Sequence, residues 1–366
     1  IKEGIEIMRK YFTYNKTRDE SFNAIVDSSL ELAREVFEGK KSADYKEKNA
    51  EVIKACGKKM VEGTPFEARF ENEGLELFKT PNVRNNSTVR DNFNAILAQI
   101  VTAIVPEVTN DTFEGFIADV HQVGFGDTAR FKIESNDLFT VNQKAEGVRK
   151  GVDQPMFDDE ITVNASPVEI STAIDWYPFA AGEFDMGNFG VKISRSFAAY
   201  IFLKAIAGMT QATTAFGAAY ATNGVTPVLF GTLRERVQAA NGGMGVLAVG
   251  TAVALSNLSL QGNYQVEIGE EMNKVGYLDQ YLGVPLVGIK NVLVPSTTNS
   301  TATLALPDNK IYLIPVAGTR PVKILFEGNE VSVSFNPDET SDKRYGISVE
   351  MRIGISAVIG AKYGII

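Results

Sequence analysis

The sequence predicts an α+β fold. Three observations lead to this class. Apolar residues recur at helical spacing near the start, a long charged excursion with strand-like ends lies in the middle, and apolar residues alternate strictly near the end. With 366 residues, 44% of them hydrophobic, the chain has enough core material to fold without disulfides.

The composition limits the classes of function and the compartment. A formal net charge of −9 argues against a basic surface for tight binding of nucleic acid. The single cysteine, Cys56, cannot form an intramolecular disulfide, which indicates synthesis in a reducing cytoplasm. The most apolar stretch, 197–209, is short and contains Lys204, so we expect no membrane segment.

The first section should form amphipathic helices. Apolar residues recur every three or four positions over 22–36 and again over 52–60. Up to Glu62 the section holds 13 Lys or Arg residues against 12 Asp or Glu residues, so the excess acidic charge lies downstream. The apolar stripes are too thin for a separate core. We expect an extended arm whose helices lie against the rest of the chain or against a neighbouring subunit.

A first core helix is predicted from Asp91 to Pro106. Asp91 is a suitable N-cap, and Pro106 is expected to end the helix because proline lacks a backbone N–H donor. The buried face would be formed by Phe93, Ile96, Leu97, Ile100, Val101 and Ile104.

A long two-stranded excursion is predicted in the middle of the chain. A strand over 116–123 is followed by Gly124 and Gly126, after which 130–134 alternates between charged and apolar residues. The alternation resumes over 161–170, so the excursion spans roughly forty residues. A hairpin of this length buries little surface and leaves both edges open, so it needs a partner outside itself.

Charged residues of both signs are concentrated in this excursion. The candidates for subunit contact are Arg130, Lys132, Glu134, Lys144, Glu146, Arg149, Lys150, Asp158, Asp159 and Glu160. Complementary contact with a neighbouring subunit is the favoured interpretation, because charged loops of this length seldom lack a function. A solvated surface loop is the alternative.

The second half of the chain alternates helices and strands before it closes in strands. A helix is expected over about 191–209, with a small-residue tail over 210–221 that implies close packing. Between 226 and 316, short helices alternate with apolar strands. Apolar residues then alternate strictly over 347–355, and these late strands must pair with earlier ones.

Four stretches of the chain share the order and residue classes of one known family. They are FIADVHQVGFGDTARFKI, ITVNASPVEISTAIDWYPFAAGEFDMGNFGVKISRSFAAY, YLGVPLVGIKNVLVPS and RYGISVEMRIGISAVIGAKYG. In this order they resemble parts of the major capsid proteins of tailed bacteriophages: the entry to an extended loop, its return strand with a long spine helix, a late axial strand and the closing strand. This Hong Kong 97-type fold is shared by encapsulin shells and herpesvirus capsid floors.

The resemblance implies six segments in chain order. They are an N-terminal arm (1–83), the first part of a peripheral domain (84–125), the extended loop (126–165), the peripheral domain with the spine helix (166–222), the axial α/β domain (223–320) and the closing strands of the peripheral domain (321–366).

The resemblance also implies a structural function. The chain would be a virion protein that self-assembles, as hexamers and pentamers, into the icosahedral head of a tailed phage. That head would enclose double-stranded DNA without sequence-specific binding and without a membrane. Portal, scaffold and decoration proteins would be further partners. In some relatives a loop lysine forms a covalent crosslink to asparagine, and Lys132, Lys144 and Lys150 are present in this loop.

The residues offer little for catalysis. The single histidine, His121, and Cys56 are far apart in sequence and in unlike contexts, so we predict no catalytic residue, no metal site and no cofactor. Gly243, Gly245 and Ala248 satisfy the spacing of a dinucleotide-binding loop, but they precede a strand where a helix is required, so a turn is expected. An encapsulin-like compartment and, less favoured, a soluble α/β enzyme are the alternatives.

Two further groups receive structural interpretations. The acidic run over 158–160 cannot converge on a cation from one strand and should be a solvated loop base. Trp176 and Tyr177, beside Pro178, could stack on a base but lack basic neighbours, so they should pack in the core.

Overall fold

The computed structural model confirms the predicted α+β class. It describes residues 16–113, 117–134, 139–141, 143, 146, 154, 157–216, 219–259, 276–289, 291–294, 301–316, 320–335, 344–357 and 362–366. The chain divides into two compact units. Unit 1 comprises Ile1–Asp111, Ser166–Ala198 and Glu327–Ile353, and unit 2 comprises Thr112–Ala165, Ala199–Phe326 and Gly354–Ile366.

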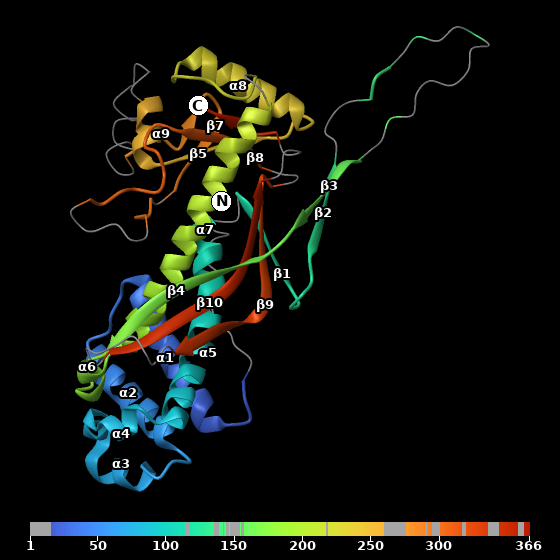
Figure 1. Cartoon of the computed structure of the whole chain (residues 1–366). Coiled ribbons are helices and arrows are strands. Elements are labelled where there is room, and N and C mark those ends of the chain that lie inside the picture. The colour runs from blue at the N-terminus through green and yellow to red at the C-terminus, as the bar shows by residue number, and fades with distance from the viewer. Residues whose placement is uncertain are drawn as a thin grey trace. The chain divides into compact units, whose positions relative to one another are not determined.

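Helices form most of unit 1 (Figure 1). They are α1 (Glu20–Glu38), α2 (Tyr45–Val61), α3 (Glu67–Glu73), the 3₁₀ helix η2 (Gly74–Lys79), α4 (Pro81–Arg84), α5 (Ser87–Phe113), α6 (Trp176–Ala180) and the first part of α7 (Met186–Phe216). The end of α5 from Thr112 and the part of α7 from Ala199 onward belong to unit 2. The Asp19 carboxylate caps α1 by accepting a hydrogen bond from the Phe22 amide at 3.0 Å. Gly39, at φ 71°, ends α1 in the left-handed conformation that glycine adopts most easily.

Aromatic rings lie at the centre of unit 1. The buried ring of Phe179 on α6 lies edge-on to Phe78 and Phe93, with centroid distances of 5.6 and 5.5 Å. Val26 of α1 and Ile53 of α2 have no exposed surface. The first helices therefore bury apolar residues within this chain.

Unit 2 contains a five-stranded mixed sheet. Its strand order is β11-β8-β5-β7-β6. The strands are β5 (Val246–Gly250), β6 (Gln280–Tyr281), β7 (Val284–Gly288), β8 (Ile311–Pro315) and β11 (Gly364–Ile365), and the helices are α8 (Pro227–Ala240) and α9 (Ala252–Ser259). β5 runs parallel to β7 and antiparallel to β8. Leu233 of α8, Leu255 of α9 and Leu313 of β8 share one buried core, which confirms the predicted alternation of helices and strands.

A second sheet has the strand order β1-β9-β10-β4. Its strands are β1 (Ala118–Val123), β4 (Ser166–Asp175), β9 (Val322–Phe335) and β10 (Arg344–Ala357). β10 pairs antiparallel with β4 from Arg344 opposite Asp175 to Ile353 opposite Ser166. The closing strand thus pairs with an earlier one, as predicted.

Within the described ranges, no helix has the length and apolarity needed to cross a membrane.

The boundaries of α5 differ from the predicted ones. The helix begins at Ser87, before the expected cap Asp91, because the Asn86 side chain already accepts a hydrogen bond from the Val89 amide at 3.2 Å. It also continues through Pro106 to Phe113. A proline inside a helix removes only one backbone hydrogen bond, and the neighbouring turns carry the helix past it.

The predictions for the aromatic residues Trp176 and Tyr177 and for the turn residue Gly243 have different outcomes. Tyr177 does not pack in the core, since it is 52% exposed, and Phe179 on the same short helix is the buried ring. The side chain of Trp176 lies outside the described residues. Gly243 has φ 81° in the turn between α8 and β5, which confirms its predicted role as a turn residue.

Candidate subunit contact surfaces

The predicted hairpin is formed by β2 (Ala129–Glu134) and β3 (Phe157–Val163), which Figure 1 shows side by side. They pair antiparallel, from Ala129 opposite Val163 to Glu134 opposite Phe157, with an irregularity at Ile133. The return limb does not continue as one strand over 161–170. It is interrupted after Val163, and the next strand, β4, pairs with β10.

Alternation along the strands places charged residues on one face of this hairpin. Arg130 Nη1 lies 3.7 Å from Glu160 Oε1, and the two side chains are 71% and 43% exposed. Lys132 stands directly opposite Glu160 in the strand register. An ion pair this exposed contributes little to stability, so the charges of this face do little for the fold of the subunit itself.

The opposite face of the hairpin base is anchored to β1 and β9. The Phe131 ring meets the His121 ring edge-on at 4.8 Å, and Lys323 Nζ lies 5.5 Å from the centroid of Phe131. Lys323, only 6% exposed, also forms an ion pair with Asp119. His121 is thus an exposed residue of β1 whose ring contacts the hairpin base.

A side-chain bridge joins the two limbs farther along the excursion. The Gln154 amide donates to the Thr140 carbonyl at 3.2 Å, and the Thr140 N–H donates to Gln154 Oε1 at 2.8 Å. Phe139 and Val141, on either side of Thr140, are 61% and 94% exposed. The excursion therefore displays apolar as well as charged groups, the combination found in protein interfaces.

The predicted contact residues fall into three groups. Those described and exposed are Arg130, Lys132, Glu146 and Glu160. Those in β2 or β3 whose side chains are outside the described ones are Glu134, Asp158 and Asp159. Those outside the described residues are Lys144, Arg149 and Lys150. The acidic run over 158–160 lies within a paired strand and is not the loop base that the sequence suggested.

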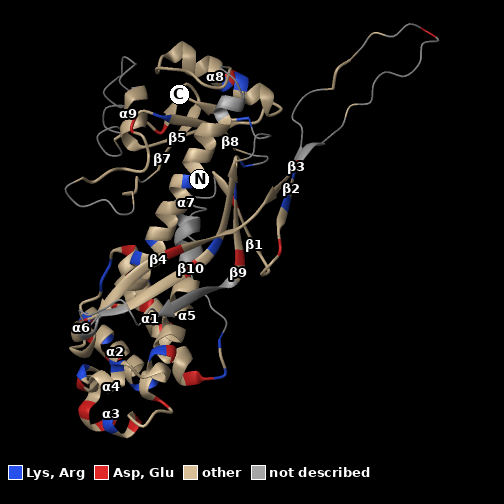
Figure 2. Cartoon of the chain, in the orientation of Figure 1, with Lys and Arg blue, Asp and Glu red and all other residues tan. Residues whose placement is uncertain are grey.

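Helices α1 and α2 provide a second charged surface. Figure 2 shows basic and acidic residues interspersed over α1 to α4, in keeping with the nearly equal numbers of both signs in this section. Lys48 pairs with Glu35 at 3.5 Å, and Lys58 pairs with Glu71 at 2.8 Å. Several of these charges are thus paired within the same few helices.

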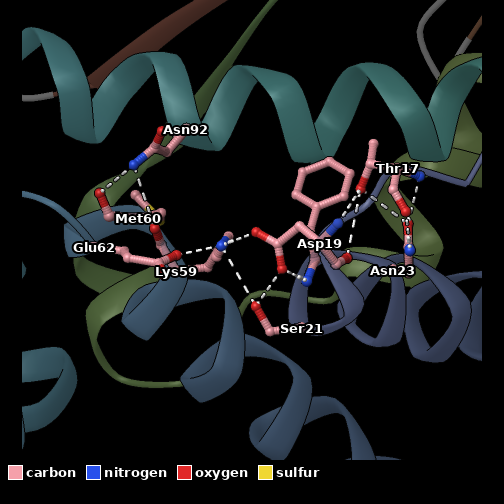
Figure 3. Close-up of polar contacts among 9 residues, drawn as sticks. Thr17, Asp19, Ser21, Asn23, Lys59, Met60, Glu62 and Asn92 are labelled. Atoms are coloured by element: carbon pink, nitrogen blue, oxygen red, sulfur yellow. Dashed lines mark hydrogen bonds and ion pairs between the residues drawn. The ribbon is translucent and has the colours of Figure 1, made fainter.

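One network joins α1, α2 and α5 (Figure 3). The Lys59 ammonium of α2 contacts the Asp19 carboxylate that caps α1, and it also contacts Glu62. The hydrogen bond from Lys59 is the main reason why the pKa of Asp19 is lowered well below its usual range. Asn92 of α5 donates to the Lys59 carbonyl at 3.3 Å. The sequence did not single out these residues, because nothing in their spacing shows that three helices meet there.

Exposed apolar residues on unit 2 were also not anticipated. Val228 in the first turn of α8 is 76% exposed, and Val253 in the first turn of α9 is 55% exposed. Leu282 is 47% exposed at φ 47°, and its carbonyl accepts a hydrogen bond from Arg234 at 2.7 Å. The sequence does contain a signal for Val228. It is two residues from the buried Phe230, and residues two apart in a helix lie on opposite faces.

Cys56 has the environment of a core residue. Cys56 is fully buried on α2, and burial raises the pKa of its thiol to about 12, so the thiol stays uncharged and packs as an apolar group. In the part of the chain that the structure describes, no three His, Cys, Asp or Glu side chains gather as a metal site would require.

The structure resembles several solved capsid shells at low sequence identity. The mature capsid of bacteriophage PhiM1 matches with a TM-score of 0.43 and 11% identity, over 69% of this chain and 86% of that chain. A virus-like particle from Pyrococcus furiosus matches with 0.40 and 10%, over 74% and 98%. The procapsid of satellite phage P4 matches with 0.43 and 10%, over 72% and 90%. No curated protein sequence matches the chain.

A sequence-family model supplies the assignment. The family described as "SPbeta prophage-derived putative capsid protein YonB" matches residues 22–366. The matched range contains the hairpin, both sheets and nearly all of the described helices. This match is made on the sequence alone, so it is independent of the structural similarities. It extends over almost the whole chain. The chain therefore belongs to the prophage-derived capsid protein family YonB, and its role is that of a structural capsid protein.

Proposed function

We propose that this chain is the major capsid protein of a tailed phage, and that many copies assemble into an icosahedral shell of the Hong Kong 97 type around double-stranded DNA. Membership of a capsid family supports this role. The observation that carries the proposal is the hairpin. Its base is anchored through Phe131, whereas Arg130 and Glu160 on the other face do little for the fold of their own subunit.

In this proposal the hairpin of each subunit lies on the next subunit of a ring. Such a contact is heterologous, since two different surfaces meet, and repeated rotation closes it into a hexamer or a pentamer. A partner that covers Phe139 and Val141 would remove apolar surface from water, and charges opposite Arg130 and Glu160 would fix the register. Weak contacts repeated around a shell allow correction during assembly.

The charge of the chain fits a container better than a DNA-binding protein. A net charge of −9 leaves no strong overall attraction for phosphate groups, so enclosed DNA would be held by the closed wall without sequence-specific contacts. Portal, scaffold and decoration proteins would complete the virion. Synthesis in a bacterial cytoplasm suits a chain whose single thiol is buried and reduced.

Size-exclusion chromatography followed by negative-stain electron microscopy tests this function. We expect the purified chain to elute as particles far larger than a small oligomer and to appear as closed shells. A stable monomer or dimer that never forms shells would overturn the proposal. Nuclease-protected double-stranded DNA inside particles from infected or induced cells supports a phage head, whereas enclosed enzyme would indicate a cellular compartment.

A further inference from the structure

An apolar groove runs between α1 and α2 in unit 1 and has a volume of about 570 Å³. Its floor is made of small or apolar residues from both helices, namely Ala24, Ile25, Ser28, Leu32, Val52 and Ala55. Ala24, Ser28 and Ala55 are exposed there. The two helices therefore leave apolar surface open along the line where they meet, and a third apolar stripe could cover it.

The rim of the groove argues against a polyanion as its occupant. Its three lysines already have carboxylate partners: Lys48 with Glu35, Lys58 with Glu71, and Lys59 with Asp19. Glu31, Glu51, Glu62 and Glu67 lie on the same rim. An amphipathic chain segment fits this groove better than a polyanion does, because it can bury its apolar side chains there and keep its charged side chains in water.

Residues 1–14, which lie outside the described residues, have such a pattern. When they are projected on a helix at about 100° per residue, Ile1, Ile5, Met8 and Phe12 form one stripe, with Ile7 and Tyr11 beside it. All charged residues fall in the other half of the projection; they are Lys2, Glu3, Glu6, Arg9 and Lys10. A helix of this length extends about 20 Å, close to the roughly 17 Å of α1 that lines the groove from Ser21 to Leu32.

The point where this segment joins the described chain lies next to α1. The Thr17 amide donates to Asn23 Oδ1 at 3.0 Å, and Lys16 Nζ lies 3.0 Å from Asp27 Oδ2. Lys16 and Thr17 therefore lie beside the first two turns of α1, one of the two helices that line the groove.

We propose that residues 1–13 form an amphipathic helix that occupies the groove between α1 and α2 of their own chain. Tethering through residues 14–16 gives this segment a millimolar effective concentration at the groove, which a segment from another molecule must exceed to compete. The occupant completes a three-helix layer and buries the floor around Ala24 and Ala55.

Disulfide trapping in the full chain tests the proposal. Ser28→Cys is combined with Met8→Cys, on the apolar stripe, or with Arg9→Cys, on the charged half, as the matched control. We expect the Met8 pair to form an intrachain disulfide about tenfold faster than the Arg9 pair or more. The product runs as a monomer of altered mobility on a non-reducing gel. If crosslinked dimers predominate, the groove binds the segment of a second copy. If both pairs form disulfides at equal rates, the apolar stripe does not dock in the groove. Either result overturns the proposal.

Hydrogen exchange supplies a second measurement that needs no crosslink. Ala55→Glu puts a charge into the groove, and Ala50→Glu puts the same charge on an exposed position of α2 outside it. We expect the amides of residues 5–12 to exchange about tenfold faster in the Ala55 variant than in the Ala50 variant or the unmodified chain. Equal exchange in all three chains contradicts docking in this groove. Both substitutions are at exposed positions, so unit 1 should fold in each.

Discussion

Gly187 occupies a position in α7 where no larger residue fits. A Cβ atom added there would lie 2.8 Å from the Ala33 amide nitrogen and 2.8 Å from the Leu32 carbonyl carbon. Both are backbone atoms of α1, which cannot move aside as the end of a side chain can. The backbones of α7 and α1 therefore approach each other closely at the beginning of α7.

Gly187→Ala should therefore destabilise the subunit, by about 1–3 kcal/mol, because it forces α7 away from α1. Gly231→Ala on α8 is the matched control, since a Cβ there meets nothing within 4 Å. Replacing glycine within a helix by alanine should stabilise it by about 0.5–1 kcal/mol. Thermal unfolding of unassembled subunits checks the opposite signs. A Gly187 variant as stable as the unmodified chain would contradict the close approach.

Asp185 joins the start of α7 to the first helices. Its carboxylate accepts hydrogen bonds from the Tyr45 hydroxyl at 2.5 Å, from the Asn188 amide at 2.9 Å and from Lys41 Nζ at 2.9 Å. Burial alone would raise the pKa of Asp185, but these three donors outweigh it and lower the pKa. Burial, together with Asp185, raises the pKa of Tyr45, so its hydroxyl remains a donor at neutral pH.

Asp185→Asn should lower the free energy of unfolding at pH 7 by about 1–3 kcal/mol, since hydrogen bonds to a charged acceptor are lost. A carboxylate whose pKa is lower in the folded chain stabilises it above the unfolded-state pKa of about 3.9. That stabilisation disappears as the pH falls through the folded-state pKa, so the difference between variant and unmodified chain should shrink in acid. Denaturant titrations at several pH values measure it.

Asp27→Asn is the control for this pH dependence. Asp27 forms an exposed pair with Lys16, and its side chain is 49% exposed. Exposed pairs typically contribute less than about 1 kcal/mol, so this variant should follow the unmodified chain at every pH. If the effect of Asp185→Asn were constant from neutral to acid pH, the ionised carboxylate would not be its cause.

At the scale of elements, the hairpin base was predictable and its continuation was not. Alternation over 130–134 indicates β2, and Gly124 and Gly126 indicate the turn before it. The division of the return limb into β3 and β4 depends on β10, a strand nearly two hundred residues away, as the pairing of Met351 with Val168 shows. Local periodicity contains no information about such a partner.

Helix ends show the same limit of sequence-based prediction. Asn86 and Asp91 are both good caps, and only the packing of the first turn decides that α5 starts at the earlier one. In the run from Trp176 to Phe179, four consecutive residues are apolar or aromatic, and the position of η2 and α5 determines that Phe179 is the one buried.

Charge reversal distinguishes the two roles that Arg130 and Glu160 could have. Either single reversal, Arg130→Glu or Glu160→Arg, places like charges together. The double reversal restores an ion pair within the hairpin but presents the opposite pattern to a neighbour. We expect the double variant to assemble severalfold less efficiently than the unmodified chain, because like charges across an interface cost several kcal/mol. Light scattering follows assembly, and circular dichroism confirms that the subunit is folded. Full recovery in the double variant would show that the pair serves the hairpin alone.

At the scale of the whole molecule, we infer that the chain is one part of a larger assembly. Each of the two units contains buried apolar residues of its own, while the hairpin displays Phe139 and Val141 to solvent. The family match extends over both units and the hairpin, so the whole matched chain is capsid-type sequence. The order of features along the chain, a hairpin followed by a long helix and late strands, was predictable because each has its own periodicity.

The most direct test removes residues 135–156 and joins β2 to β3 through a short Asn-Gly turn. The paired strands from Ala129 to Glu134 and from Phe157 to Val163 are kept, so the hairpin base can still fold on Phe131. Electron microscopy of the purified product, with sedimentation to measure its size, is the readout. The account predicts folded subunits or small rings that do not close into shells. Closed shells of unchanged size and yield would contradict it.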